Sequence, residues 1–248
     1  MKVELVSYSQ SAITYEGKPS PVIPRTPTLR YGVLTPGTST DEKSLSELVA
    51  YCARVSNPSN QHNTETNDRL LRYLIKNKHW SPFEMVSICL EIESTRDIVR
   101  QILRHRSFSF QEFSQRYAVA DLGFEYKEAR IQDTKNRQNS IALSDDTEES
   151  VFLQTEWTAR QKQLSDLAET NYQWALTNGI AKEQARAVLP EGMTMSRIYM
   201  NGTLRSWIHY IELRSSNGTQ KEHRDVAIAC ARAIDAVFPI SELLGLKQ

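Results

Sequence analysis

The segment Arg104–Tyr117 concentrates side chains that are suited to binding an anion. Its fourteen residues contain three arginines, one histidine and three serines, interleaved with four aromatic rings. An arginine guanidinium presents a planar fork of N–H donors that matches phosphate oxygens. A solvated loop would gain nothing from Phe108, Phe110 and Phe113, so we expect a partly buried anion site here, for a nucleotide.

A second set of arginines lies closer to the carboxyl end. Arg186 stands beside apolar residues, and a half-buried arginine needs either an anionic ligand or an internal carboxylate; the sequence leaves both open. Arg205 and His209 are one helical turn apart. Arg214 lies nine residues beyond Arg205, so it points partly aside from that face.

The overall charge excludes some partners. The chain has 30 Lys and Arg against 30 Asp and Glu, so no global field exists to hold nucleic acid or an anionic membrane. No stretch is apolar for long enough to cross a bilayer, and the first residues do not resemble a signal peptide. We therefore expect a cytoplasmic protein without nucleic-acid or membrane partners. The 248 residues are interpreted as a single domain, 1–248.

The cysteines and histidines give no sign of a nucleophile or a metal centre. Cys52, Cys89 and Cys230 form no C-x-x-C pair and have apolar neighbours, which is typical of small core residues. The histidines show no H-E-x-x-H spacing, so no metal is expected. No G-x-G-x-x-G loop is present, which argues against a Rossmann fold.

The elements that must position these residues follow from apolar spacing and turn residues. Strands are predicted over 3–8, 85–93 and 195–200. Helices are predicted over 44–55, 66–77, 95–105, from 146–149 to about 177, and over 181–188, 203–213 and 221–237. Residues 17–40 indicate an irregular segment, and 128–147 a polar loop or insertion. The fold class is α+β, a small mixed or antiparallel sheet packed by several long helices.

The helix over 95–105 carries a row of like charges. Arg96, Arg100 and Arg104 fall at i, i+4 and i+8, where they repel unless a carboxylate or an anion relieves them. We expect Arg104 to be functional and Arg96 to be a solvated surface charge.

Four segments together resemble motifs of the flavin-dependent thymidylate synthases, also called thymidylate synthase complementing proteins. They are, in the family's order, Lys78–Glu84 (His-x-Ser/Thr-Pro-Phe-Glu), Arg104–Arg106 followed after seven intervening residues by Ser114, Arg186–Pro190 (Arg-x-x-Leu-Pro), and Leu204–Arg214. The resemblance covers most of the chain after about residue 45. It implies methylation of dUMP to dTMP, with methylene-tetrahydrofolate as carbon donor and NADPH-reduced FAD as hydride source. It also implies a homotetramer with shared active sites.

The resemblance implies a role for each matching residue. The catalytic residues would be Arg214 at the uracil carbonyl, with His79 and Tyr117 near the flavin ring and the folate. The FAD contacts would be Ser81, Arg104, His105, Arg106, Glu112, Arg205 and His209. The dUMP contacts would be Gln101, Arg104, Glu112, Phe113, Ser114, Gln115, Arg116, Arg186 and Arg214, with Ser114, Arg116 and Arg186 on the phosphate. Because no cysteine is expected to attack the uracil ring, Arg214 and backbone donors would instead stabilise charge that develops on its carbonyl oxygen.

The chain departs from the family at a few positions, and other functions stay open. Gln111 stands where Asn is frequent, Thr203 stands where the family has an Asn that contacts the cofactor, and Gly218 stands where some members have a histidine that contacts FAD. His223 lies five residues later and does not inherit that role. One alternative is a nucleotide-binding transferase or phosphatase without flavin. Another is a single-strand nucleic-acid-binding module that stacks bases on phenylalanines, although the zero net charge counts against it.

Overall fold

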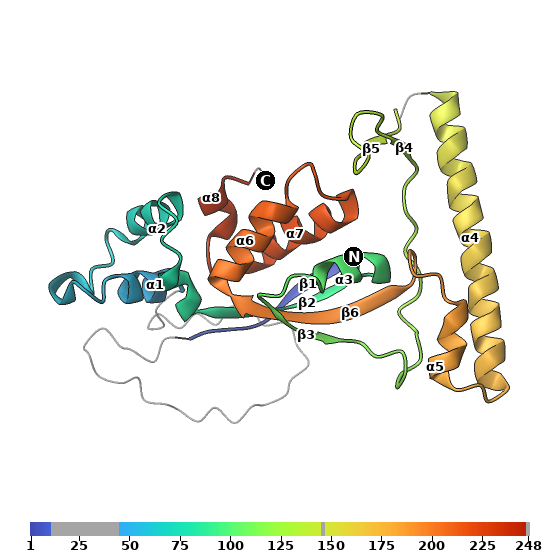
Figure 1. Cartoon of the computed structure of the whole chain (residues 1–248), viewed down its shortest axis with the longest axis horizontal. Helices are drawn as coiled ribbons and strands as arrows, with labels where there is room; N and C mark the ends of the chain where they lie inside the picture. The colour runs from blue at the N-terminus through green and yellow to red at the C-terminus, as the bar shows by residue number, and fades with distance from the viewer. Residues whose placement is uncertain (11–44, 145–146, 247–248) are drawn as a thin grey trace.

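The computed structural model describes residues 1–10, 45–144 and 147–246. Figure 1 shows a twisted sheet in the middle, helices α6 and α7 over one face of it, the pair α1 and α2 at one end, and the long helix α4 at the other. The predicted irregular segment 17–40 lies outside the described residues.

The central sheet is four-stranded and antiparallel, in the order β1-β2-β6-β3. The strands are β1 (Lys2–Tyr8), β2 (Ser87–Thr95), β6 (Met195–Thr203) and β3 (Ser109–Glu112). Along β2, the side chains of Ile88, Leu90 and Ile92 are buried while their neighbours are half-exposed, because alternate residues of a strand face opposite sides of the sheet. The predicted α+β class with a small antiparallel sheet is confirmed. The β2 strand starts two residues later than predicted because Ser81–Met85 form a 3₁₀ turn.

Eight α-helices are described in the visible parts of the chain, and most lie where the apolar spacing predicts them. They are α1 (Leu45–Ala53), α2 (Asn67–Lys76), α3 (Arg96–Ile102), α4 (Glu148–Thr177), α5 (Lys182–Ala185), α6 (Leu204–Arg214), α7 (Lys221–Ile234) and α8 (Ile240–Leu244). The short helix α8 was not predicted. Gly179 follows α4 with φ at 77°, the left-handed conformation that glycine adopts readily at a helix end.

Helix α3 ends three residues earlier than predicted. The backbone N–H groups of Arg104 and His105 bond to the carbonyls of Gln101 and Ile102, three residues back, at 3.4 and 3.0 Å. The chain therefore tightens into a turn after Ile102. The predicted row of three arginines is wrong, because Arg104 leaves the helix.

The polar segment 128–147 is not simply a loop in its described part. Strands β4 (Arg130–Gln132) and β5 (Ser140–Ala142) form an antiparallel hairpin. The Asp133 carboxylate accepts hydrogen bonds from the backbone N–H groups of Lys135 and Asn136 and from the Asn139 side chain. These local bonds organise the tip without the apolar alternation by which a strand is recognised in a sequence.

The main core lies between the sheet and helices α6 and α7. Trp207 of α6 is fully buried, and its Nε1 donates a hydrogen bond to the carbonyl of Ile88 at 3.0 Å. The Phe108 ring packs edge-on against Trp207, with centroids 4.8 Å apart, so this core also anchors the segment after Arg106. Among the residues described here, no helix has both the length and the hydropathy needed to traverse a membrane.

Candidate active site

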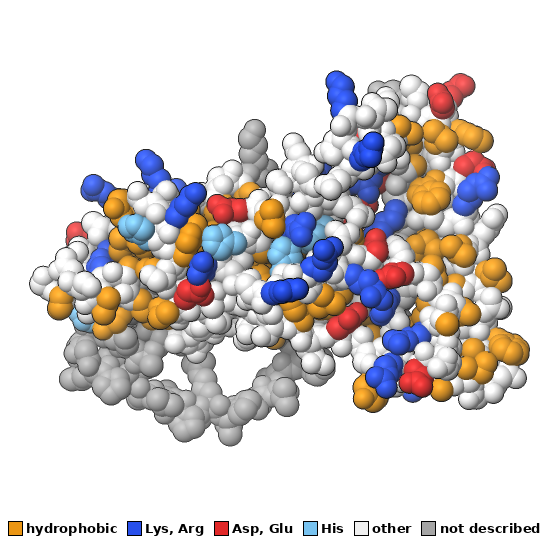
Figure 2. All heavy atoms as spheres, in the orientation of Figure 1, with side chains coloured by type: hydrophobic (Ala, Val, Ile, Leu, Met, Phe, Trp, Pro, Cys, Tyr) orange, Lys and Arg blue, Asp and Glu red, His pale blue; other side chains and the backbone are white. Residues whose placement is uncertain are grey.

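Helix α6 carries the Leu204–Arg214 motif and contacts the Lys78–Glu84 motif. Its N-cap is Thr203, whose side chain accepts a hydrogen bond from the backbone N–H of Ser206. Its apolar face is buried in the core, which leaves Arg205 and His209 exposed. Arg205 Nη1 donates to Glu84 Oε1 at 2.8 Å, and the Trp80 ring meets the His209 ring edge-on at 4.5 Å. Figure 2 shows histidine and basic side chains gathered across this side of the molecule.

The Glu84 carboxylate is held ionised at this junction. The hydrogen bond from the Thr203 side chain, helped by the bond from Arg205, lowers the pKa of Glu84, although partial burial acts the other way. Thr203 therefore has a defined structural role at the position where it departs from the family pattern.

The carboxyl end of α6 holds the Arg-His-Arg segment. Arg214 Nε donates a hydrogen bond to His105 Nε2 at 2.9 Å. Burial, together with the nearby Arg214 charge, lowers the pKa of His105 to about 4, so the ring is neutral near pH 7. A nitrogen that accepts a hydrogen bond carries no proton, and the His105 proton therefore sits on Nδ1. Arg214 is fixed through Nε, and its terminal N–H groups remain available to a ligand.

Arg104 and Arg106 flank this contact with free positive charges. Both side chains are exposed, and neither makes a hydrogen bond or an ion pair with any other residue in the described parts of the chain. Two unpaired guanidiniums beside the ordered Arg214 form a donor set that suits a diphosphate. These residues therefore fit the FAD that the family motif implies, although the antiparallel sheet offers no Rossmann site.

Two other predicted residues, Gln115 and Arg186, line a cavity of about 290 Å³. Its lining includes Arg96, Arg100, Gln115 and Arg186, with Glu183 and Glu191 at the same site. Gln115 is only 3% exposed, yet its Nε2 has no hydrogen-bond partner among the residues that the structure describes. Because an unpaired buried donor is costly, this amide marks a place for an acceptor such as a phosphate oxygen.

The carboxylates around this cavity keep the arginines in place. Arg100 pairs with Glu191, Arg116 with Glu183 at 3.5 Å, and Arg96 with Glu112 at 3.6 Å. The expectation that Arg96 is solvated is wrong, since its side chain is only 17% exposed. Helical spacing alone could not reveal this, because the partner of Arg96 is Glu112 at the end of β3, outside the helix. Arg96 and Arg100 are thus candidate ligand-binding residues that sequence reasoning missed.

The remaining predicted residues lie around these two sites. Glu112 accepts a hydrogen bond from Ser196 Oγ at 3.2 Å, and the Phe113 N–H donates to the carbonyl of Arg197. Ser114 is half-buried in the turn that follows β3, and Ser81 is exposed at the start of its 3₁₀ turn.

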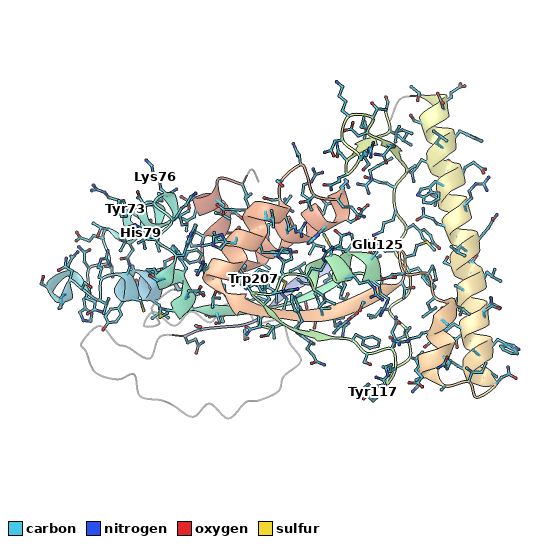
Figure 3. All side chains as sticks on the ribbon, in the orientation of Figure 1. Tyr73, Lys76, His79, Tyr117, Glu125 and Trp207 are labelled. Atoms are coloured by element: carbon cyan, nitrogen blue, oxygen red, sulfur yellow. The ribbon has the colours of Figure 1, made fainter. Side chains whose placement is uncertain are left out.

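His79 and Tyr117 are not brought together within one chain. His79 follows α2 and contacts the Tyr73 ring, with centroids 5.8 Å apart. Tyr117 is 79% exposed beside α5, where Lys182 Nζ donates to its carbonyl oxygen. Figure 3 shows the two side chains well separated in the view, His79 near α2 and Tyr117 toward the end of the molecule that carries α5.

The cysteines are poor candidates for a nucleophile. Cys52 and Cys89 are half-buried and Cys230 is fully buried, and burial raises the pKa of each thiol. A thiolate nucleophile needs the opposite shift. In the described stretches, no cluster of three His, Cys, Asp or Glu side chains is arranged to bind a metal ion.

Comparison with known proteins gives a consistent answer. Residues 40–240 match the sequence model of a family described as thymidylate synthase complementing protein. The chain is 51% identical over 193 residues to the "Probable flavin-dependent thymidylate synthase" of Paramecium bursaria Chlorella virus 1, covering 78% of this chain and 87% of the viral protein. It is 48% identical over 192 residues to the flavin-dependent thymidylate synthase of Synechocystis sp., covering 77% and 85%.

A similar fold is found among solved structures. The UMP/dUMP methylase PolB from Streptomyces cacaoi, bound with 5-Br dUMP, superimposes with a TM-score of 0.71 at 25% identity, covering 98% of this chain and 93% of that one.

Proposed function

The chain belongs to the family of flavin-dependent thymidylate synthases, and we propose that it methylates dUMP to dTMP, with methylene-tetrahydrofolate as carbon donor and NADPH as reductant. The observation that carries the substrate assignment is the cavity around the unpaired Gln115 amide, since its arginines suit the phosphate of a nucleotide. Arg186, Arg116 and Ser114 would bind that phosphate.

FAD, when bound and reduced by NADPH, would supply the hydride that reduces the transferred carbon. Arg104, Arg106 and Arg205 would hold its phosphates, together with Ser81 and His209. The support for this assignment is the charge of Arg104 and Arg106, which no described carboxylate neutralises.

Arg214 would polarise the uracil ring in place of a cysteine nucleophile. Its Nε is held by the neutral His105, so the guanidinium cannot rotate freely and keeps its terminal N–H groups in one direction. Donors fixed in this way stabilise negative charge that develops on a carbonyl oxygen, and they do so without further reorganisation.

We also propose that the active sites are shared in a homotetramer. The family resemblance implies that His79 and Tyr117 act at one active site, and a second chain would bring them together. Helix α4 supports self-association, because Leu153, Trp157, Leu164, Leu167 and Trp174 form one exposed apolar stripe along its 30 residues. Figure 2 shows hydrophobic side chains along this helix.

The test is dTMP formation from dUMP, methylene-tetrahydrofolate and NADPH, measured with protein stripped of flavin and with FAD restored. We expect product only when FAD is present. Absence of product in both arms, with a known thymidylate synthase active in the same mixture, would contradict the proposal. Binding of dUMP without FAD dependence in that case would indicate a nucleotide-binding protein without flavin chemistry.

A further inference from the structure

We propose that His223 is a positioning residue that fixes the side-chain amide of Gln101 for its contact with dUMP. The inference rests on the proposed function and on the family resemblance, which implies that Gln101 contacts dUMP. His223 lies on α7 and is fully buried, and its ring nitrogens face residues of two other helices. Nδ1 lies 3.2 Å from Gln101 Oε1 of α3, and Nε2 lies 3.2 Å from the Tyr210 hydroxyl of α6.

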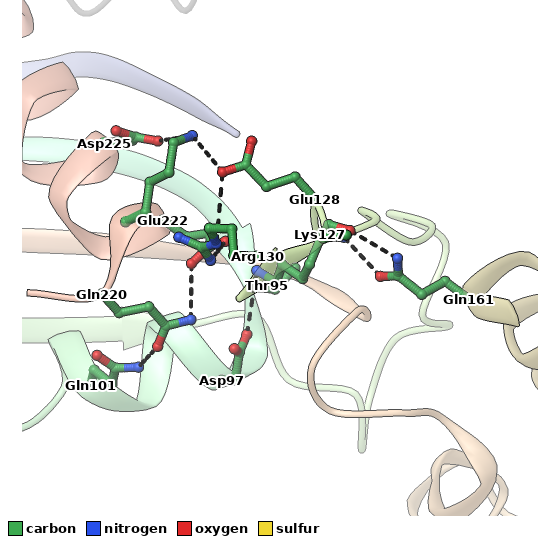
Figure 4. Close-up of polar contacts among 12 residues, drawn as sticks. Thr95, Asp97, Gln101, Lys127, Glu128, Arg130, Gln161, Gln220, Glu222 and Asp225 are labelled. Carbon is green, nitrogen blue, oxygen red and sulfur yellow. Dashed lines mark hydrogen bonds and ion pairs between the residues drawn. The ribbon is translucent and has the colours of Figure 1, made fainter. Parts of the chain in front are cut away.

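The direction of these hydrogen bonds is set from a carboxylate (Figure 4). An ionised Glu222 can only accept hydrogen bonds, so Gln220 must turn its Nε2 toward it, at 2.9 Å. The Oε1 of Gln220 then faces α3 and accepts from Gln101 Nε2 at 2.8 Å. The Oε1 of Gln101 is thereby left facing His223, where an oxygen can only accept.

The His223 tautomer follows from this chain. Nδ1 must carry the proton that it donates to Gln101 Oε1, and Nε2 must accept from the Tyr210 hydroxyl. Burial, with the charge of Arg214 nearby, lowers the pKa of His223 to about 3, so the ring stays neutral and keeps one donor and one acceptor. Gln101 is thus held on both sides, and neither contact tolerates a flipped amide.

Glu222, the carboxylate from which this series of hydrogen bonds starts, is itself held in place. Glu222 is paired with Arg130 of the β4–β5 hairpin, whose side chain is 12% exposed. Burial opposes ionisation of Glu222, but the hydrogen bonds that it accepts, first that of Arg130, keep the pKa of its carboxyl below the ordinary value. Glu222 therefore remains an acceptor at neutral pH.

The arrangement leaves one defined donor on Gln101. The Nε2 group has two N–H bonds, of which one goes to Gln220, and the side chain is half-buried rather than sealed. An unconstrained amide could present its oxygen in place of this N–H. With the amide fixed, Gln101 offers the same N–H to every substrate molecule.

The experiment separates this role from simple filling of the core. In His223→Asn the new amide nitrogen stands near the position of Nδ1 and can still donate to Gln101. In His223→Gln the amide reaches the Nε2 position, so the contact with Tyr210 can be kept while the donor to Gln101 is lost. Both variants lose the buried ring, and their difference therefore reports the donor. His62→Gln, an exposed histidine near α2, is the matched control.

The Kd for dUMP is measured by calorimetry on the FAD-loaded protein, with KM and kcat measured alongside. We expect His223→Gln to raise the Kd and KM for dUMP by about fivefold to tenfold, which is the size of one neutral hydrogen bond, with a smaller change in kcat. His223→Asn should stay within about twofold of the unmodified chain. In Glu222→Gln the new amide can donate to Gln220, so the orientation of the Gln220 and Gln101 amides is no longer fixed. This variant should also raise the Kd for dUMP, and it provides the test if a His223 variant does not fold.

Equal dUMP affinity of the Asn and Gln variants, or an unchanged Kd in Glu222→Gln, would overturn the positioning role. Failure of the unmodified chain to bind dUMP or to form dTMP would instead contradict the proposed function.

Discussion

Replacing Gly202 with alanine tests how the Arg-His-Arg segment is anchored. A Cβ on Gly202 would lie 2.4 Å from Cδ1 and 2.6 Å from Cε1 of Phe108, so the ring must move by about 1 Å to reach ordinary contact. Phe108 is only 9% exposed and is packed against Trp207 and Tyr210, with centroids 4.8 and 5.9 Å away. Overpacking of this kind costs about 1–3 kcal/mol, which for a chain of this size lowers Tm by about 2–12 °C.

The displacement should also weaken the binding of FAD. The backbone N–H of Phe108 bonds to the carbonyl of His105 at 3.3 Å, so a shifted ring moves the turn that carries Arg104 and Arg106. Thermal unfolding and the Kd for FAD are measured for Gly202→Ala and for the control Gly192→Ala, whose added Cβ would meet no atom within 4 Å.

Truncating the ring gives a second check. Phe108→Leu should be less destabilising in the Gly202→Ala background than alone, because the smaller side chain relieves the contact. The reasoning is refuted if Gly202→Ala has the Tm and the Kd for FAD of the unmodified chain. It is also refuted if the stability effects of the two substitutions are strictly additive, because the added Cβ then does not press on the Phe108 ring.

Four other predictions follow from single features. Lys78 has φ at 58°, so Lys78→Val should lower the free energy of urea unfolding by about 1–2 kcal/mol, whereas Lys78→Gly should not. Arg214→Ala should abolish dTMP formation while flavin absorbance still reports bound FAD; retained turnover would refute its role. Because the pKa of His105 is about 4 and that of His223 about 3, against about 6.5 when unfolded, the unfolded chain binds more protons between pH 6.5 and 4. The free energy of urea unfolding should therefore fall as pH is lowered through this window, and fall less in His223→Asn. Leu167→Glu on the exposed α4 stripe should reduce the mass seen by light scattering, and an unchanged mass would exclude α4 from the assembly.

The elements were predictable from sequence where apolar spacing matched local structure. In β2 and in α6 one face is buried, so apolar residues recur with the period of a strand or a helix, and this pattern can be seen in the sequence. The early end of α3 could not be read in this way, because it depends on a switch to three-residue backbone bonds at Arg104. The β4–β5 hairpin escaped prediction because its tip is held by Asp133 side-chain bonds rather than by alternating hydrophobicity.

The site was predictable only in its residue types. Arginines near serines indicate an anion, but the sequence does not say which arginine is paired by which glutamate. The partners of Arg96 and Arg205 come from segments 16 and 121 residues away, at Glu112 and Glu84. Likewise, the connection of His223 to Gln101 spans 122 residues, so no local pattern could reveal it.

Helix α3 couples the two parts of the candidate site. Successive residues of a helix point about 100° apart, and here Arg100 lines the cavity around Gln115 while Gln101 turns toward α7. Arg100 is held by Glu191, and Gln101 by Gln220 and His223, so the helix is tied on two sides. A change that rotates α3 would therefore disturb the cavity and the Gln101 amide together. Under the proposed function, the buried His223 of α7 would therefore influence the same substrate as the arginines of the cavity, although it lies 122 residues from Gln101.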